Sequence, residues 1–170
     1  SNKQRDINGV NGFEMDTRGI ALGFDKQISD RFLIGGAVSQ TRSDLDVRNA
    51  PRKTDIESDQ ITLYGSLKDD NWYFDVAVGY ARNSYDGSRY IPALGRTARS
   101  DFDGNQFVIQ GTYGLEFNPG DGAAVISPYA GLQYMNLDNN DYRESGAGEL
   151  DLAVSSDDMS ALQATLGLSL

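Results

Sequence analysis

Two residue types that carry much of the metal and acid–base chemistry of proteins are missing, because the sequence contains no cysteine and no histidine. Without cysteine there is no disulfide, no thiolate metal site and no thiol nucleophile. Without histidine the chain lacks the commonest general base at neutral pH and the usual zinc ligand. Motifs for a nucleophilic serine, a bound phosphate or a dinucleotide are also absent. We therefore predict no enzymatic activity and no cofactor.

Long apolar runs are missing too, and negative charge exceeds positive charge. No stretch approaches the roughly 18 apolar residues of a membrane-spanning helix, which excludes a helical membrane protein. A β-barrel is not excluded, because only alternate strand residues meet lipid. The 15 basic and 25 acidic residues give a net charge of -10, which repels nucleic acid. We therefore expect no nucleic-acid partner.

Segments of alternating character dominate what is present. The run 72–80 places Trp72, Phe74, Val76, Val78 and Tyr80 on one face and smaller or polar residues mostly on the other. A period of two residues is typical of a β-strand with one apolar face. Seven further segments show the pattern in varying strength: 17–28, 32–41, 60–67, 106–117, 124–137, 150–154 and 162–170.

The connections between these segments alternate in length. Short turns are predicted around 29–31, 68–71 and 118–122, and long charged loops at 42–57, 84–101 and 138–148. In an up-and-down meander, this order puts every short turn at one end and every long loop at the other. Outer-membrane barrels show the same asymmetry. The sequence therefore predicts an all-β, antiparallel, up-and-down transmembrane β-barrel with about eight strands in this chain.

Alternation alone leaves open a soluble, lipocalin-like barrel whose apolar side chains point inward. Three features favour the opposite orientation. The polar face consists mainly of small residues, charges inside the strands fall on that face, and aromatic residues gather near both strand ends as in membrane girdles. The predicted lumen-facing residues are Asp25, Asp75, Gln106, Gln110, Glu116 and Asp151. The predicted lipid-facing or girdle residues are Phe24, Phe32, Trp72, Phe74, Val76, Val78, Tyr80, Phe107, Tyr113 and Phe117.

Carboxylates in the predicted loops raise the question of calcium. Asp101 and Asp103 lie close together, and a second acidic cluster spans 138–144. Neither group has the spacing of a dedicated calcium loop, and acidic loops are usually solvated. We therefore predict no metal site.

Several segments together resemble one family, the translocator β-barrel domain of autotransporters, which belong to type V secretion. The resemblance covers nearly the whole chain and rests on the order and spacing of 12–19, 23–25, 34–37, 64–65, 72–73, 79–80, 103–106, 127–134 and 142–148. It implies a barrel of about twelve strands in the outer membrane of a Gram-negative cell. On this basis residues 1–170 are expected to be a partial translocator domain that lacks most of the first strand, the lumen helix and the C-terminal strands.

The resemblance favours one function and leaves two alternatives. The favoured function is an outer-membrane anchor that supports export and surface display of an N-terminal passenger, with outer-membrane lipid, the passenger and the barrel-assembly machinery as partners. The first alternative is a closed eight-stranded barrel with adhesive or structural surface loops. The second is the soluble ligand-binding barrel.

Overall fold

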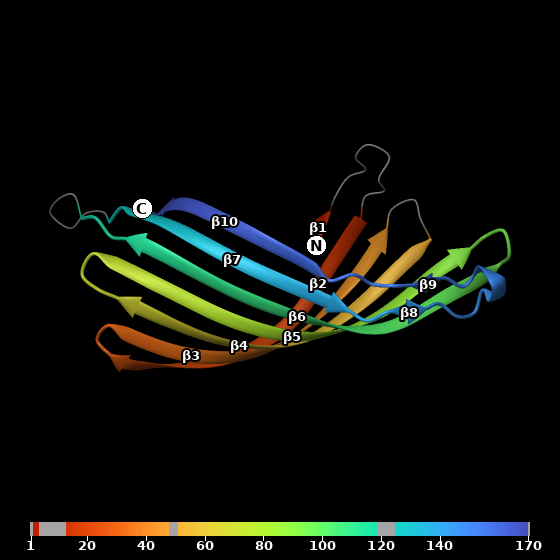
Figure 1. Cartoon of the computed structure of the whole chain (residues 1–170), viewed down its shortest axis with the longest axis horizontal. Helices are drawn as coiled ribbons and strands as arrows, with labels where there is room; N and C mark the ends of the chain where they lie inside the picture. Colours follow the sequence, from red (N-terminus) through yellow and green to blue (C-terminus); the bar gives the residue numbers. More distant parts are fainter. Residues whose placement is uncertain (1, 4–12, 48–50, 119–124, 170) are drawn as a thin grey trace.

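The computed structural model describes residues 2–3, 13–47, 51–118 and 125–169, and these form an antiparallel meander (Figure 1). The main sheet has the strand order β1-β2-β3-β4-β5-β6-β7-β10, and β8 and β9 form a separate two-stranded sheet. The elements are β1 (Asn2–Lys3), β2 (Phe13–Ser29), β3 (Phe32–Val47), β4 (Arg52–Lys68), β5 (Trp72–Ile91), β6 (Arg96–Leu115), β7 (Ser127–Asn139), β8 (Tyr142–Arg143), the short 3-10 helix η1 (Gly148–Leu150), β9 (Ala153–Val154) and β10 (Met159–Ser169).

The long strands follow from the alternating pattern, which places apolar residues opposite one another on one face, as in the pairs Leu22 with Val38 and Val38 with Ile61. Between β5 and β6 the pairing runs unbroken from Trp72 opposite Leu115 to Ile91 opposite Arg96. The pairing of β2 with β3 has one irregularity, between Gln27 and Ser29. In the described residues, no helix is long and apolar enough to cross a membrane.

The sheet is curved and open (Figure 1). Among the described residues, β10 pairs only with β7, and β2 pairs with β3 and with the two residues of β1. Strands β2, β4 and β6 end, and β3, β5 and β7 begin, at one end of the sheet, which we call the turn end. Strands β3 and β5 end, and β4 and β6 begin, at the other end, as the meander topology predicts.

The predicted long loops at 42–57 and 84–101 are wrong. Strands β3 and β4 continue to Val47 and from Arg52, and β5 and β6 continue to Ile91 and from Arg96. Charged residues take the place of apolar ones on one face of these segments, and the backbone ladder continues regardless. A ladder needs only backbone donors and acceptors, so a strand with a water-facing side tolerates charge.

The predicted seventh strand at 150–154 is also wrong. Residues Gly148–Leu150 form η1, and Ala153–Val154 pair with Tyr142–Arg143 outside the main sheet. Strand β10 takes the place beside β7, with Met159 opposite Leu137. The region between β7 and β10 is therefore a third extended hairpin, formed by β8, η1 and β9. The main sheet still has eight strands, because β1 joins it at the other edge.

Very little of the described chain is buried. Among the residues that the structure describes, the buried apolar ones are three alanines, Ala81, Ala98 and Ala147, and no large side chain is completely covered. Large apolar side chains are instead exposed, up to 85% for Leu166. The hydrophobic effect opposes such exposure in water, so this sheet requires an apolar environment on one face.

Candidate functional site

The exposed apolar side chains gather on one face of the sheet, in a band that we call the belt. Residues directly opposite each other in a ladder share a face, and one row joins Leu22, Val38, Ile61, Tyr80 and Phe107 across β2 to β6. The belt includes these and Ile20, Phe24, Ile34, Leu63, Leu67, Phe74, Val76, Val78, Ile109, Tyr113, Leu132, Tyr134, Leu162, Leu166 and Leu168, together with the half-buried Phe32 and Trp72 on the same face.

The belt has the height of a membrane core. From Trp72 to Tyr80, β5 contributes nine residues, which agrees with the roughly 9–11 residues of a tilted transmembrane strand. Trp72 stacks on Tyr113 near the turn end, with ring centroids 6.1 Å apart. At the upper edge, Tyr80 donates a hydrogen bond from its hydroxyl to Asn105 Oδ1 at 2.8 Å. The belt therefore has aromatic side chains at both of its boundaries, and Tyr80 has a polar partner at the boundary away from the turn end.

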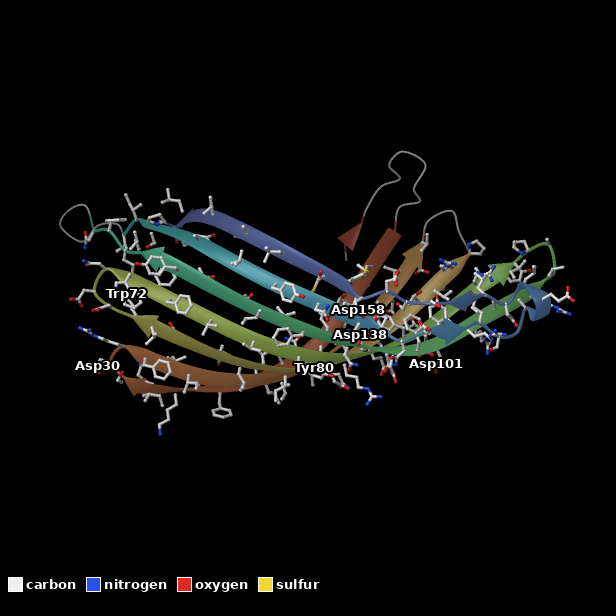
Figure 2. All side chains as sticks on the ribbon, in the orientation of Figure 1. Asp30, Trp72, Tyr80, Asp101, Asp138 and Asp158 are labelled. Atoms are coloured by element: carbon white, nitrogen blue, oxygen red, sulfur yellow. The ribbon has the colours of Figure 1, made fainter. Side chains whose placement is uncertain are left out.

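Ten residues were predicted to face lipid, and nine of them belong to the belt. The tenth, Phe117, follows β6 and pairs with Ile126 through an isolated bridge. In Figure 2, Trp72, Tyr80 and Asp101 follow one another along the sheet, away from the turn end. The structure therefore gathers the predicted set on one face.

The opposite face carries mainly small and polar residues, and we call it the polar wall. One row crosses seven strands and contains Asp25, Gly35, Tyr64, Ala77, Gln110, Gln133 and Gln163. Asp75 lies on the next row, between Ser66 and Thr112. Gln106 lies on the same face opposite Ala81. Four of the six predicted lumen-facing residues thus share the polar wall.

The remaining two predicted residues lie elsewhere. Glu116 follows the end of β6 and accepts a hydrogen bond from Lys68 Nζ at 2.9 Å, close to the turn end. Asp151 lies beside η1, because the strand predicted there does not form. Its carboxylate accepts hydrogen bonds from the backbone N–H groups of Ala147 at 2.7 Å and Gly148 at 3.1 Å. Asp151 therefore stabilises a turn and does not lie on the polar wall.

Three tyrosine rings on the polar wall lie across glycines of neighbouring strands. The pairs are Tyr64 with Gly35, Tyr73 with Gly114, and Tyr129 with Gly167, each directly opposed in the ladder. A Cβ atom added at any of these glycines would overlap the tyrosine ring. Glycine is therefore required at these positions for close approach, and the ring covers backbone that a side chain would otherwise fill.

Beyond the belt, the same strands change character in a region that we call the collar. It comprises residues 14–18, 40–47, 52–59, 82–91, 96–105 and 140–158. On the belt side, five directly opposed aspartates form one row: Asp16, Asp44, Asp55, Asp86 and Asp101. Partial desolvation raises the pKa of Asp55, and the hydrogen-bonded carboxyl of Asp44 raises it further. Like charges directly opposite each other weaken a sheet, so this row suits only a well-hydrated surface.

The inner side of the collar is aromatic and partly buried. The rings of Tyr85, Phe102 and Tyr142 stack in sequence, with centroids 4.7 Å and 4.3 Å apart. The guanidinium of Arg89 donates to the carboxylate of Glu144, and these hydrogen bonds lower the pKa of Glu144. Arg89 also donates to the carbonyl of Leu150 at 3.0 Å. These contacts hold the hairpin 140–158 against β5 and β6.

The two acidic residues Asp101 and Asp103, which were considered as calcium ligands, both lie on β6. Asp103 accepts hydrogen bonds from Ser84 Oγ at 2.7 Å and Arg82 Nη2 at 3.1 Å, and these bonds lower its pKa. Asp101 belongs to the aspartate row of β6. In the part of the chain that the structure describes, no group of three or more acidic residues has the arrangement to hold a metal ion.

Sequence reasoning missed the collar, including the aspartate row and the contact between Arg89 and Glu144. A signal was available for the outer side, because charged residues alternate with small or apolar ones through 42–47 and 52–59. No local signal identifies Arg89 and Glu144 as partners, since they are 55 residues apart.

Comparison with known proteins gives a consistent result. Residues 1–170 match a family described as the autotransporter beta-domain. "Outer membrane protein A" of Rickettsia conorii is 26% identical over 182 residues, which cover 96% of this chain and 9% of that protein. "Outer membrane protein B" of Rickettsia typhi is 26% identical over 148 residues, which cover 81% of this chain and 9% of that protein. The chain thus spans about a tenth of the length of these relatives.

Two solved structures share the fold. The translocator domain of autotransporter NalP from Neisseria meningitidis superposes with a TM-score of 0.83 at 17% identity, over 96% of this chain and 56% of that one. The beta domain of the Bordetella autotransporter Brka superposes with a TM-score of 0.65 at 18% identity, over 95% of this chain and 63% of that one. Both are β-domains of autotransporters.

Proposed function

Because the chain belongs to the autotransporter beta-domain family, we propose that its sheet is one wall of a barrel that holds a passenger polypeptide at the outer membrane and supports its export to the cell surface. Membership of this family places the chain in the outer membrane of a Gram-negative cell, as a translocator domain linked to a passenger. The passenger's identity and activity are not part of the proposal. The family is defined by a translocator domain without a reaction of its own, and we assign no enzymatic step to these residues.

The opposition of the two faces carries this proposal. The belt is nine residues high on β5 and exposes large apolar side chains, whereas the polar wall behind it carries glutamine, threonine, alanine and glycine. We propose that the belt contacts outer-membrane lipid and that Asp25, Asp75, Gln106 and Gln110 line a hydrated lumen. In a bilayer every backbone group must be paired within the protein, and the long ladders provide that pairing.

The open edges suggest how this sheet is completed. We propose that β2 and β10 pair with further strands of the same protein, so that residues 1–170 are part of a larger translocator domain. The missing parts would include most of the first strand, the lumen helix and the C-terminal strands, as the family resemblance implies. Until such strands arrive, an open edge presents unpaired backbone groups that the barrel-assembly machinery could engage. The alternative of a closed eight-stranded barrel would require the two edges to pair, and the described sheet has β1 and β10 at opposite edges.

Residues 1–170 contain no cysteine, which permits a direct test in the full-length protein once any cysteine elsewhere in it has been replaced by serine. Single cysteines at Val76 and Val78 on the belt, and at Asp75 and Ala77 on the polar wall, sample adjacent residues of one strand. We expect a membrane-impermeant maleimide to label positions 75 and 77 in outer-membrane vesicles, and a lipid-soluble probe to label 76 and 78. The reverse pattern, or equal labelling of all four by the water-soluble reagent, would contradict the proposal.

A further inference from the structure

A groove on the outer side of β2 to β5 begins in the belt and ends at three arginines. Its central part has a volume of about 450 Å³, and Ile20, Val38, Ile61, Tyr80 and Arg82 contribute to its lining. Two further hollows share lining residues with it and extend it in both directions. One of about 470 Å³ is apolar and lies deeper in the belt, and one of about 550 Å³ lies in the collar beside Arg18 and Arg42.

The three arginines stand at the upper boundary of the belt. On β2, β3 and β5 they are the first cations beyond the apolar residues, and Arg18 lies directly opposite Arg42 in the ladder. Their side chains are 81% (Arg18), 63% (Arg42) and 69% (Arg82) exposed. Each also contacts a carboxylate, but ion pairs this exposed are weak and do not prevent a guanidinium from binding another anion.

Charge is layered along the outer side of this region. Apolar residues are followed by two rows in which the three arginines alternate with Glu57, Asp59 and Asp103, and the aspartate row lies farther out. A membrane lipid with a phosphorylated headgroup has a matching order, since its acyl chains are followed by phosphate and then by groups in water. The arginines extend over four strands, or about 14 Å at the usual spacing between strands, which is more than one phosphate can bridge.

From this arrangement we propose that the groove binds the phosphorylated glycolipid of the outer leaflet, lipid A, with acyl chains on the belt and phosphates on Arg18, Arg42 and Arg82. The inference rests on the proposed function, because it requires the belt to face lipid and the collar to lie at the cell surface. Arginine suits phosphate because its planar guanidinium donates two parallel hydrogen bonds. Asp59 and Glu57 also line the groove, and their carboxylates can accept hydrogen bonds from sugar hydroxyls. An ordinary phospholipid without a sugar would leave these two acids facing its phosphate.

The test compares two triple variants of the full-length protein purified from outer membranes in detergent. The first carries R18Q, R42Q and R82Q. The control carries K53Q, R99Q and R143Q, which removes the same charge from collar residues that do not line the groove. We expect the first variant to retain about tenfold less lipid A per folded barrel, because charge-assisted hydrogen bonds to phosphate are lost, and the control to retain the wild-type amount. The single variant R42Q is measured in parallel in case the triple variant inserts poorly.

Rebinding to delipidated protein identifies the ligand. Vesicles containing lipid A should bind to the wild type, whereas dephosphorylated lipid A and inorganic phosphate should bind at least tenfold more weakly. The proposal would be overturned if both triple variants retained the same amount of lipid A, or if dephosphorylated lipid A bound as tightly as lipid A. If the triple variant fails to insert, an unchanged amount of lipid A on R42Q would overturn it. So would binding of inorganic phosphate as tight as that of lipid A. Cysteine labelling at 75–78 distinguishes failure of the lipid site from failure of the proposed function. If labelling follows the expected pattern but lipid A retention does not depend on the arginines, only the lipid site is contradicted.

Discussion

Strand β5 carries Trp72, Phe74 and Val76 on its outer face near the turn end, whereas farther along the same face it carries Arg82 and Asp86. On its other face the order is reversed, from Asp75 and Ala77 in the polar wall to Tyr85 in the aromatic stack of the collar. The backbone ladder is the same in both regions. The comparison teaches that the surrounding solvent, and not the strand pairing, selects which face is apolar.

The largest effect should come from placing a charged residue, of the kind that the collar tolerates, at a position in the belt. We expect Val76→Arg to destabilise the inserted barrel by about 2–4 kcal/mol, the cost of an arginine facing lipid near mid-depth. Ser84→Arg, on the same face of the same strand but in the collar, should change stability little. The measurement is the denaturant midpoint of heat-modifiable gel mobility. Equal destabilisation by both variants would remove the distinction between belt and collar.

A smaller difference in stability is expected between alanine substitutions on the polar wall and on the belt. We expect Gly114→Ala to destabilise the sheet by about 1–3 kcal/mol, because the added methyl group forces the Tyr73 ring out of its position on the polar wall. Gly111→Ala, three residues away on the belt face, meets Phe74 at an ordinary distance of 3.6 Å.

This second variant should be neutral or slightly stabilising, because alanine reduces the entropy of the unfolded chain. Folding yield into detergent micelles would measure both changes. If Gly111→Ala were the more damaging of the two, the close approach of Tyr73 to Gly114 would not be a constraint.

The smallest effect should appear within the collar, where acid acts on two carboxylates in opposite directions. Glu144 has a lowered folded-state pKa, so its contribution to stability is present above its usual value of 4.5 and is lost as the pH falls through the folded-state pKa. Asp55 has a raised pKa, so its contribution is fully present below the usual 3.8 and is lost as the pH rises through the folded-state pKa.

Hydrogen exchange of the full-length protein near pH 3 and at pH 7 would test this contrast. We expect acid to reduce protection of 140–158 while it preserves the outer ends of β3 and β4. Glu144→Gln should lower protection of 140–158 several-fold at pH 7. Asp55→Asn should slightly raise protection of β4 at pH 7, whereas Asp59→Asn should not, since Asp59 lies opposite Arg82. Uniform loss of protection throughout the collar in acid would contradict the assignment.

The sequence predicts which residues share a face of the sheet, but it does not predict the lengths of the strands. The period of two residues is a local property, so Trp72 to Tyr80 and their neighbours could be assigned to one face before any contact was known. Charge at 42–57 and 84–101 is typical of loops, so the sequence predicts strand ends that the structure does not have. Backbone pairing is indifferent to that charge, so β3 continues to Val47 and β5 continues to Ile91, and β4 and β6 begin at Arg52 and Arg96.

The hairpin between β7 and β10 could not be predicted for a different reason. It is held by Arg89 with Glu144 and by Phe102 with Tyr142, which join segments 55 and 40 residues apart in the chain. Periodicity within 150–154 suggested a strand of the main sheet, but these tertiary contacts decide where the segment lies. Asp151 was consequently assigned to the lumen, although its role is to hold a turn.

The unbroken ladder between β5 and β6 has a mechanical consequence. Its twenty residue pairs run from the belt into the collar, and their hydrogen bonds lie perpendicular to the strands. A pulling force along the strands, such as a polypeptide moving outward could exert on the collar, would load these bonds in shear and distribute the tension over many rungs at once. The same force on a flexible loop would stretch the loop first. On the proposed function, such stiff hairpins would transmit a pulling force from the collar to the part of the protein held by the membrane, without separating the strands beneath.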